Sequence, residues 1–298
     1  MAHAVATPSA SLLHQQARRT RHSRRHQRCC AAASAAVPPG GTVLVAGATG
    51  GVGQLAVAYL LSQGFSVRAL VRDKQKAQQL FAATTPRLEL VVGDTRDRGS
   101  LDICAGLDGV ICCTGTTAFP SARWAGDNGP EQTDSLGVSN LVSAVAAQSS
   151  GLQRFVLVSS VGVLRTGQLP FSILNLGGVL TAKAKGEAAL QCSGLPWTIL
   201  RPGRLTDGPY TSYDLNTLLK ATAETRRKPQ LALDDTLTPQ ESSRLVVASA
   251  AVAALRSGPA VGRSFDVGSV EGQGIDGDGG AAWQAAWDAQ FGAARRAA

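Results

Sequence analysis

Histidine is almost missing from this sequence, and the few residues present are confined to one end. All four histidines, His3, His14, His22 and His26, lie within the first 26 of the 298 residues. The rest of the chain therefore offers no Ser-His-Asp triad, no histidine metal ligand and no imidazole general base. Any chemistry in that part must use other side chains.

Cysteine is also scarce, and its spacing suits neither metal binding nor cross-linking. No CxxC pair occurs among the six cysteines, Cys29, Cys30, Cys104, Cys112, Cys113 and Cys192. The sequence therefore predicts no zinc site, no other metal site and no disulfide framework. We interpret Cys112 and Cys113, which end an apolar run, as core residues, with a thiol redox switch as the alternative.

Long apolar runs are absent as well, although apolar residues make up 44% of the chain. A membrane-spanning helix needs about 18 or more consecutive apolar residues, so no transmembrane segment is expected. A chain of this length and composition is able to bury a substantial core.

Acidic residues are missing from the first 36 positions, which hold six arginines. The net charge of +8 thus falls to +2 for the remainder, and we expect no nucleic-acid binding by the folded part. An Arg-, Ala- and Ser-rich segment without acids is typical of an organellar transit peptide. We expect residues 1–36 to be a disordered chloroplast transit peptide, with a mitochondrial leader or a basic arm that binds RNA or membrane as alternatives.

After this leader, short apolar runs alternate with segments of helical periodicity. The runs are 42–47, 66–71, 88–93, 109–114, 154–160 and 197–202, and the helical segments are 53–64, 73–83, 100–106, 131–148 and 180–194. Such alternation predicts an α/β fold, a doubly wound parallel sheet (Rossmann fold) with helices on both faces. We expect this domain to cover residues 41–270, followed by a linker and a C-terminal helix in residues 271–298.

The stretch "VLVAGATGGVG" joins the first run to the first helical segment. Its glycines allow a tight turn at Gly47, backbone approach to a pyrophosphate at Gly50 and close packing of the helix at Gly53. Such a turn predicts a dinucleotide phosphate site. The expected cofactor contacts there are Gly47, Thr49, Gly50, Gly51, Val52 and Gly53.

Residues after the next runs complete the predicted cofactor edge. Val71 stands where an NAD-binding protein usually presents an acid, and Arg72 follows with a guanidinium suited to a 2′-phosphate. We therefore expect NADP, with NADPH preferred over NADH. Asp94 is expected at adenine, and Thr114 and Gly115 are expected beside adenine and ribose.

Five stretches together carry a family resemblance: "VAGATGGVGQ", "LVRD", "VVGDTRD", "RFVLVSSVGV" and "LPWTILRPGRLTDGP". They resemble the atypical short-chain dehydrogenase/reductase group with NmrA-like, NAD(P)-binding domains, in a plant and algal chloroplast branch. The resemblance implies NADP binding and a transit peptide, and several relatives in this group serve as scaffold or assembly factors.

The resemblance also implies a catalytic serine followed by a Tyr-x-x-x-Lys motif. Ser159 and Ser160 fill the serine position, and Lys185 fits the lysine, which would also bind the nicotinamide ribose. Four residues before Lys185 stands Thr181, and the other register, Lys183, gives Val179. The phenolic proton donor is therefore missing in both registers.

Two loop tyrosines, Tyr210 and Tyr213, are candidate surrogates, although lining or closing the pocket is the role that we favour for them. We accordingly expect a cofactor-dependent sensor or scaffold in the chloroplast, binding NADP(H) and a plastid protein partner with weak or no turnover. The alternative is an NADPH-dependent oxidoreductase or isomerase acting on a small carbonyl compound.

Overall fold

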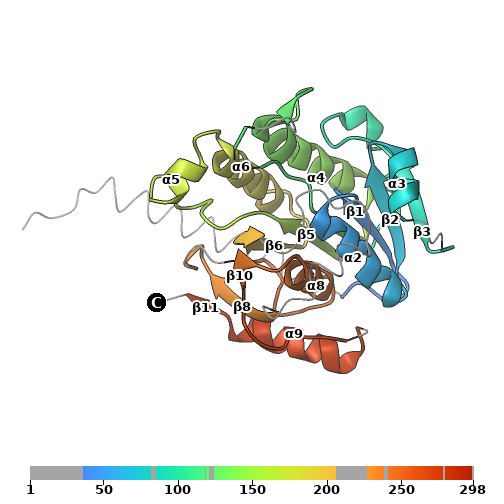
Figure 1. The fold of residues 1–298 in the computed structure, drawn as a ribbon. Coiled ribbons are helices and arrows are strands. Elements are labelled where there is room, and N and C mark those ends of the chain that lie inside the picture. Colours follow the sequence, from blue (N-terminus) through green and yellow to red (C-terminus); the bar gives the residue numbers. More distant parts are fainter. Residues whose placement is uncertain are drawn as a thin grey trace, which may run out of the picture.

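The computed structural model describes residues 36–81, 85–117, 119–120, 124–205, 227–237, 241–277 and 279–296. In this part of the chain one large sheet has the strand order β11-β8-β10-β6-β5-β4-β1-β2-β3 (Figure 1). Its strands are β1 Thr42–Ala46, β2 Ser66–Val71, β3 Leu88–Val92, β4 Gly109–Cys112, β5 Arg154–Val158, β6 Trp197–Pro202, β8 Lys228–Leu233, β10 Arg263–Val270 and β11 Arg295–Arg296. A small separate sheet pairs β7 Arg204–Leu205 with β9 Glu241–Ser242.

The predicted parallel, doubly wound sheet is confirmed. Strands β1 to β6 and β10 pair in parallel, and the order reverses between β1 and β4, which places the topological switch point there. Strand β8 was not anticipated, because its sequence KPQLAL contains Pro229 and lacks a continuous apolar run. It pairs antiparallel with β10, near the edge of the sheet, where a mixed strand is common.

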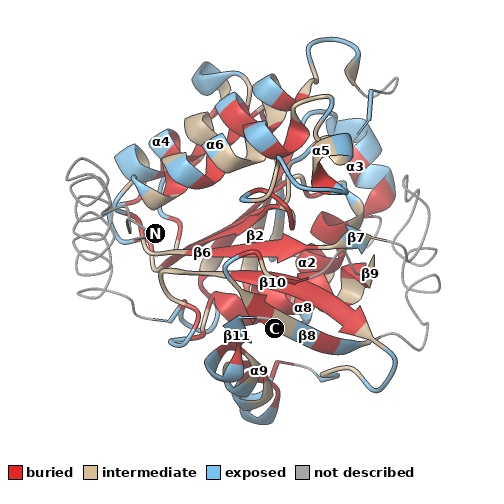
Figure 2. Ribbon diagram, turned by 90° about the vertical axis from the view of Figure 1, so that its left-hand side faces the viewer, coloured by how far each residue is buried: buried red, intermediate tan, exposed pale blue. Residues whose placement is uncertain are grey.

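Helices cover both faces of the sheet (Figures 1 and 2). One face carries α2 Gly51–Ser62, α3 Lys74–Leu80, α8 Arg244–Ala254 and α9 Ala281–Ala293, whose buried residues share one core cluster. The other carries α4 Gly137–Gln148 and α6 Val179–Gln191, and α4 continues from a π-helical turn at Glu131–Leu136. Since each face of the central strands is covered, these strands are buried along their whole length (Figure 2).

One helical prediction is wrong. Residues 100–106 have helical periodicity, but the structure forms only a 3-10 turn at Arg98–Ser100, followed by turns. The segment is too short for a self-sustaining helix. The hydroxyl of Ser100 instead donates to the Asp97 carbonyl at 2.8 Å, which holds the chain in this turn.

The expected C-terminal helix is α9, and its tryptophans pack on the body of the protein. Trp283 and Trp287 are buried, and the indole N–H of Trp287 donates to Ser249 of α8 at 3.0 Å.

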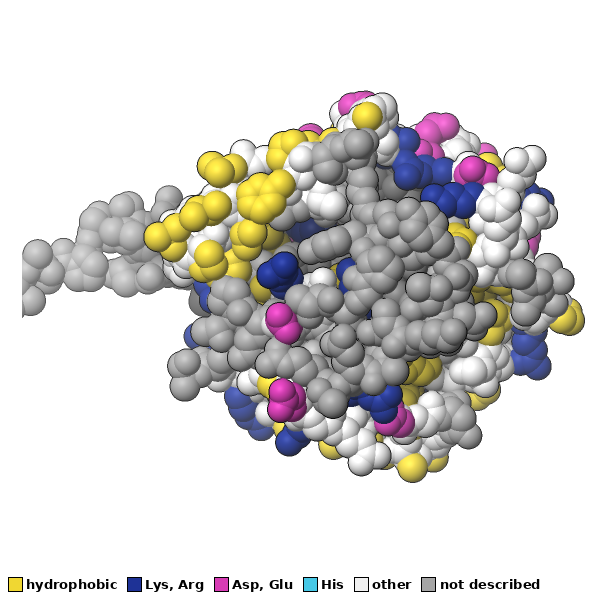
Figure 3. Space-filling view, in the orientation of Figure 1, with side chains coloured by type: hydrophobic (Ala, Val, Ile, Leu, Met, Phe, Trp, Pro, Cys, Tyr) yellow, Lys and Arg dark blue, Asp and Glu magenta, His cyan; other side chains and the backbone are white. Residues whose placement is uncertain are grey.

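An apolar surface surrounds the short helix α5, Phe171–Leu174 (Figure 3). Three apolar side chains of this surface, Leu169, Ile173 and Leu176, are 75%, 52% and 80% exposed, and Leu164 nearby is 62% exposed. We refer to residues 164–177 as the α5 segment. No charged residue other than Arg165 occurs in it.

Buried charges lie beneath the carboxyl ends of β6 and β10. The guanidinium of Arg201 donates twice to Glu187 of α6, at 3.0 and 2.6 Å, and this pair ties the helix to the sheet. Asp235 accepts from the backbone N–H groups of Gly162 and Leu164, which fixes the start of the α5 segment. Asp266 lies opposite Arg201 in the sheet register.

Asp266 predicts a pH dependence of stability. Its carboxyl is fully buried, one oxygen has no partner among the described residues, and burial raises its pKa from 3.8 to about 6. Because the folded-state pKa is the higher one, this stabilising contribution is complete below pH 3.8 and is lost as the pH rises through about 6. Between about pH 5 and about pH 8 the loss should be about 1.4 kcal/mol.

Urea unfolding of the unmodified protein and of Asp266→Asn at both pH values tests this prediction. The amide keeps an oxygen for the Leu237 N–H but cannot ionise, so the variant should gain stability relative to the unmodified protein as the pH rises. A difference between the two proteins that does not change with pH would contradict the assignment.

Candidate functional site

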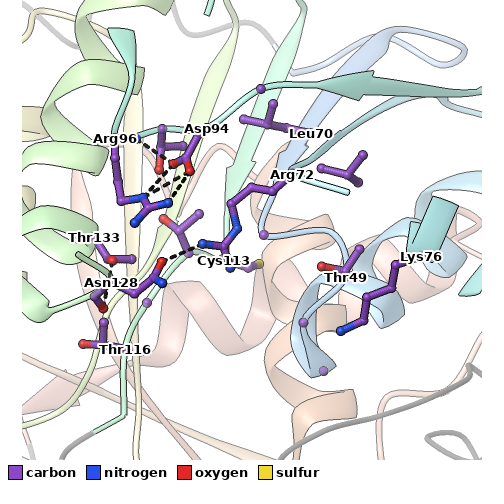
Figure 4. Close-up of a pocket in the computed structure, with 18 of the residues that line it drawn as sticks. Thr49, Leu70, Arg72, Lys76, Asp94, Arg96, Cys113, Thr116, Asn128 and Thr133 are labelled. Atoms are coloured by element: carbon purple, nitrogen blue, oxygen red, sulfur yellow. Dashed lines mark hydrogen bonds and ion pairs between the residues drawn. The ribbon is translucent and has the colours of Figure 1, made fainter. Parts of the chain in front are cut away.

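A cavity of about 580 Å³ opens at the carboxyl ends of β1 to β4, at the topological switch point (Figure 4). Most of the predicted cofactor contacts line it: Gly47, Thr49, Gly50, Gly51, Arg72, Asp94, Thr114 and Gly115. Val52 and Gly53 lie in the first turn of α2 and do not line it, and neither does Lys185.

Backbone geometry makes the phosphate end of the cavity. Gly47 has a φ of 75°, and a Cβ there would lie 2.8 Å from the Cys113 carbonyl, so only glycine fits this turn between β1 and α2. A Cβ at Gly53 would lie 2.1 Å from the Gly47 carbonyl oxygen, so α2 starts in direct contact with the turn.

The start of α2 suits an anion. Its N-cap residue is Gly50, which supplies no side-chain cap, and its first turn contains no acidic residue. The helix dipole and the first backbone N–H groups are therefore available to a phosphate. A Cβ on Gly50 would meet only the Gly47 carbonyl oxygen, at 3.2 Å, and otherwise open space in the cavity.

Three basic side chains also line the cavity: Arg72, Lys76 and Arg96. The guanidinium of Arg96 donates to both carboxylate oxygens of Asp94, at 3.0 and 2.6 Å, and this bonding lowers the pKa of Asp94. The Asp94 carboxylate, predicted to face adenine, is thus already paired with a cation.

Lys76 and Arg96 were missed by the sequence reasoning. Lys76 lies in the first turn of α3 after the N-cap Asp73, and Arg96 lies two residues after Asp94. Basic residues that directly follow the second and third strands were the available signal, because both strands end at the cavity.

The α6 lysine whose side chain lies against Gly115 is Lys183. Its ammonium donates to Asp134 at 2.6 Å, and a Cβ on Gly115 would lie 2.9 Å from its Nζ. Asp134 is 1% exposed and also accepts from the hydroxyl of Thr116 at 2.5 Å. The ammonium is therefore held beside the cavity by a buried carboxylate.

Lys185, the lysine of the first register, faces solvent instead. Its side chain is 55% exposed and pairs with Glu131 at 2.9 Å. Thr181 lies on the same exposed side of α6, and its hydroxyl accepts from Asn175 at 2.9 Å. The structure brings neither residue to the cavity, and Val179, which precedes Lys183 by four, is buried in an apolar cluster.

The candidate serines follow β5. Ser159 is buried, and its hydroxyl oxygen has no hydrogen-bond partner in the part of the chain that the structure describes. The Ser160 hydroxyl donates to the Val161 carbonyl at 3.0 Å. Tyr210 and Tyr213 lie outside the described residues.

Three buried or half-buried cysteines are poorly suited to thiolate chemistry, and of these only Cys113 is a lining residue of the cavity. Burial raises the pKa of Cys112 and of Cys113, and it raises the pKa of Cys104 to about 11. Among the described residues no group of three or more His, Cys, Asp or Glu side chains is placed to hold a metal ion. No helix found there is long and apolar enough to cross a bilayer.

Comparison with known families decides the assignment. A family model described as NAD(P)H-binding matches residues 47–257. The chain belongs to this family. The resemblance of this chain to the atypical short-chain dehydrogenase/reductase group, inferred above from the sequence, is also confirmed by the relatives that follow.

Among relatives of this NAD(P)H-binding chain, the protein TIC 62, chloroplastic, of Arabidopsis thaliana is 39% identical over 69% of the chain. That match spans only 32% of the TIC 62 protein. An uncharacterized chloroplastic protein of the same plant is 38% identical, covering 72% of this chain and 71% of its own. Sanguinarine reductase of Eschscholzia californica is 32% identical, covering 76% and 89%.

Solved structures share the fold. A putative NAD-dependent epimerase/dehydratase from Bacillus halodurans superposes with a TM-score of 0.61 at 23% identity, covering 79% of this chain and 96% of its own. A short-chain dehydrogenase/reductase from Veillonella parvula, in complex with NADP, has a TM-score of 0.56 at 17% identity, covering 76% and 94%.

The cavity fits the dinucleotide that this family binds. The glycine turn and the start of α2 would hold the pyrophosphate, Arg72 and Lys76 would meet the adenosine ribose, and Lys183 would meet the nicotinamide ribose. A bound nicotinamide supplies hydride chemistry. The role of the cavity residues themselves would be to bind and orient the dinucleotide.

Two glycine substitutions separate binding from folding. Gly50→Ala should place a methyl group in the cavity and weaken NADPH binding by at least about tenfold, a loss of about 1.4 kcal/mol. It should change the melting temperature of the free protein little, because the methyl meets only one atom. Gly53→Ala should instead destabilise the free protein, because its Cβ would overlap the Gly47 carbonyl.

Thermal unfolding with and without NADPH measures both effects. Normal NADPH stabilisation of Gly50→Ala would mean that the phosphates bind elsewhere.

Proposed function

We propose that this protein is an NADP(H)-binding sensor or scaffold of the chloroplast, with weak or no turnover of its own. One observation carries the proposal: the lysine beside the cavity, Lys183, is preceded at the fourth position by buried Val179 rather than by a phenol. The same lysine is held by the buried carboxylate of Asp134. Among the described residues, no phenol thus stands four positions before the lysine that would meet a nicotinamide ribose.

The missing acid matters because carbonyl reduction needs a proton as well as a hydride. A positioned general acid contributes typically about 10² to 10⁴-fold to such a reaction. Thr181 cannot replace it, since its hydroxyl is far less acidic than a phenol and lies on the exposed side of α6. Binding without rapid turnover is what a sensor requires.

A preference for NADP(H) is supported by charge. Arg72 and Lys76 line the adenosine end of the cavity, and the acid nearest to them in the lining, Asp94, is paired with Arg96. A 2′-phosphate would add a dianion beside two cations that have no carboxylate partner in the described structure, and charge-assisted bonds of this kind are the stronger ones.

A plastid location and a protein partner are supported by the relatives. Those named above from Arabidopsis thaliana carry the word chloroplastic in their names, which fits the acid-free leader and gives the mitochondrial alternative no support. The exposed α5 segment is the kind of surface that proteins use for contacts (Figure 3). We further propose the domain limits predicted above, with residues 41–270 as the cofactor-binding domain.

A second function, reduction of a small carbonyl compound, is favoured by one observation. The Ser159 hydroxyl is buried at the end of β5 without a partner among the described residues, as a substrate-orienting group would be. Sanguinarine reductase, a relative that this chain matches over 89% of its length, has a name that indicates a reductase. Tyr210 or Tyr213 would then have to supply the proton.

Single-turnover mixing of the NADPH-loaded protein with quinones, aldehydes and flavins distinguishes the two functions. We expect NADPH to stay reduced, and we expect Thr181→Tyr not to restore turnover, because that side chain faces solvent. Arg72→Ala is the matched control for cofactor loading. Rapid NADPH oxidation that is lost in Tyr210→Phe or Tyr213→Phe would establish the reductase and refute the sensor.

A further inference from the structure

The cofactor edge is physically joined to a short segment of residues 124–128, which we name the arm. The side chains of Arg72, Arg96, Thr117 and Thr133 hold it by hydrogen bonds, that of Thr133 by donating to the Asn128 carbonyl at 3.3 Å. The Arg72 guanidinium donates to the side-chain oxygen of Asn128 at 2.6 Å, and Arg96 donates to the carbonyls of Gly126 and Asp127 at 2.9 and 3.0 Å (Figure 4). Both arginines also line the cofactor cavity.

A further contact lies at the other end of the arm. The Trp124 indole N–H donates to Thr117 at 3.2 Å, and the edge of the ring lies against Gly177. A Cβ on Gly177 would be 2.5 Å from the ring, so only glycine fits beneath it. Gly177 ends the α5 segment, whose apolar side chains are exposed.

Arg72 has two possible partners at this edge. Its guanidinium points to Asn128 and away from the Lys76 ammonium (Figure 4). To bind a 2′-phosphate held between Arg72 and Lys76, the Arg72 guanidinium has to turn from Asn128 toward Lys76. A dianion with two charge-assisted bonds outcompetes a neutral amide, because such bonds are about twice as strong.

We propose that Asn128 reports which cofactor is bound at Arg72: NADP(H) draws Arg72 away from the Asn128 side chain and loosens that end of the arm, where the Thr133 hydroxyl still donates to the Asn128 carbonyl at 3.3 Å, whereas NAD(H) leaves the Arg72 bond intact. Arg96, which stays paired with Asp94, keeps the middle of the arm in place. The release therefore pivots the arm and changes the contact of Trp124 with Gly177. This inference rests on the proposed NADP(H) site, and it predicts that NADP(H) binding there alters the surface of the α5 segment.

Hydrogen exchange of the arm and Trp124 fluorescence test the proposal on the full chain. The ligands are NADP⁺ and NAD⁺ at equal saturation, with adenosine 2′,5′-bisphosphate and adenosine 5′-monophosphate as probes of the adenosine end alone. We expect NADP⁺ and the bisphosphate to give faster exchange in residues 124–128 and an altered Trp124 signal. Trp124→Phe identifies that signal against Trp197, Trp283 and Trp287.

Two substitutions of Asn128 should change NADP⁺ affinity in opposite directions. Asn128→Ala should show the released signal without ligand and bind NADP⁺ about 2- to 12-fold more tightly, the equivalent of one typical hydrogen bond. Asn128→Asp should pair with Arg72, bind NADP⁺ more weakly and leave NAD⁺ binding nearly unchanged. Gln153→Ala, at the amino end of β5, is the matched amide control and should change neither.

The outcomes separate this inference from the function on which it rests. Preferential NADP⁺ binding with an arm that responds equally to NAD⁺, or with slower exchange under NADP⁺, would overturn the role of Asn128 and leave the NADP(H) site standing. Absence of any preference for NADP⁺ would overturn both.

Discussion

The close contact between the first turn and the first helix determines where everything else in this protein lies. Gly53 and Gly47 approach so closely that a single methyl group would be 2.1 Å from a carbonyl oxygen. This contact places the start of α2 over the switch point between β1 and β4, with its backbone N–H groups directed at the cavity. The strands on either side then supply Arg72, Asp94 and Gly115 from successive carboxyl ends.

The two ends of the cavity are built for different purposes. At the adenosine end two arginines, Arg72 and Arg96, are bound to the arm, and Arg72 is thus able to respond to a phosphate. At the nicotinamide end Lys183 is fixed by a buried carboxylate and has an apolar neighbour in place of an acid. A site with this division of charge is suited to responding differently to NADP(H) and NAD(H). The arm connects this response to the exposed α5 segment.

Much of this was predictable from the sequence, for identifiable reasons. Strands of apolar residues and a glycine turn are local patterns, so the sheet and the phosphate end of the cavity followed directly from them. The lysine register was not predictable, because Lys183 and Lys185 are two residues apart and only the packing of α6 decides which one pairs with buried Asp134 and which one faces solvent. The arm was equally hidden, since Arg72 and Asn128 are 56 residues apart and nothing in the local sequence marks Asn128 as its partner.

Calorimetric titration of the unmodified protein and of Arg72→Ala with NADPH and with NADH tests the central claim most directly. The account predicts that NADPH binds the unmodified protein at least about tenfold more tightly than NADH, a difference of about 1.4 kcal/mol, and that Arg72→Ala removes this difference by weakening NADPH alone. Equal affinities in the unmodified protein, or a preference that survives Arg72→Ala, would contradict it.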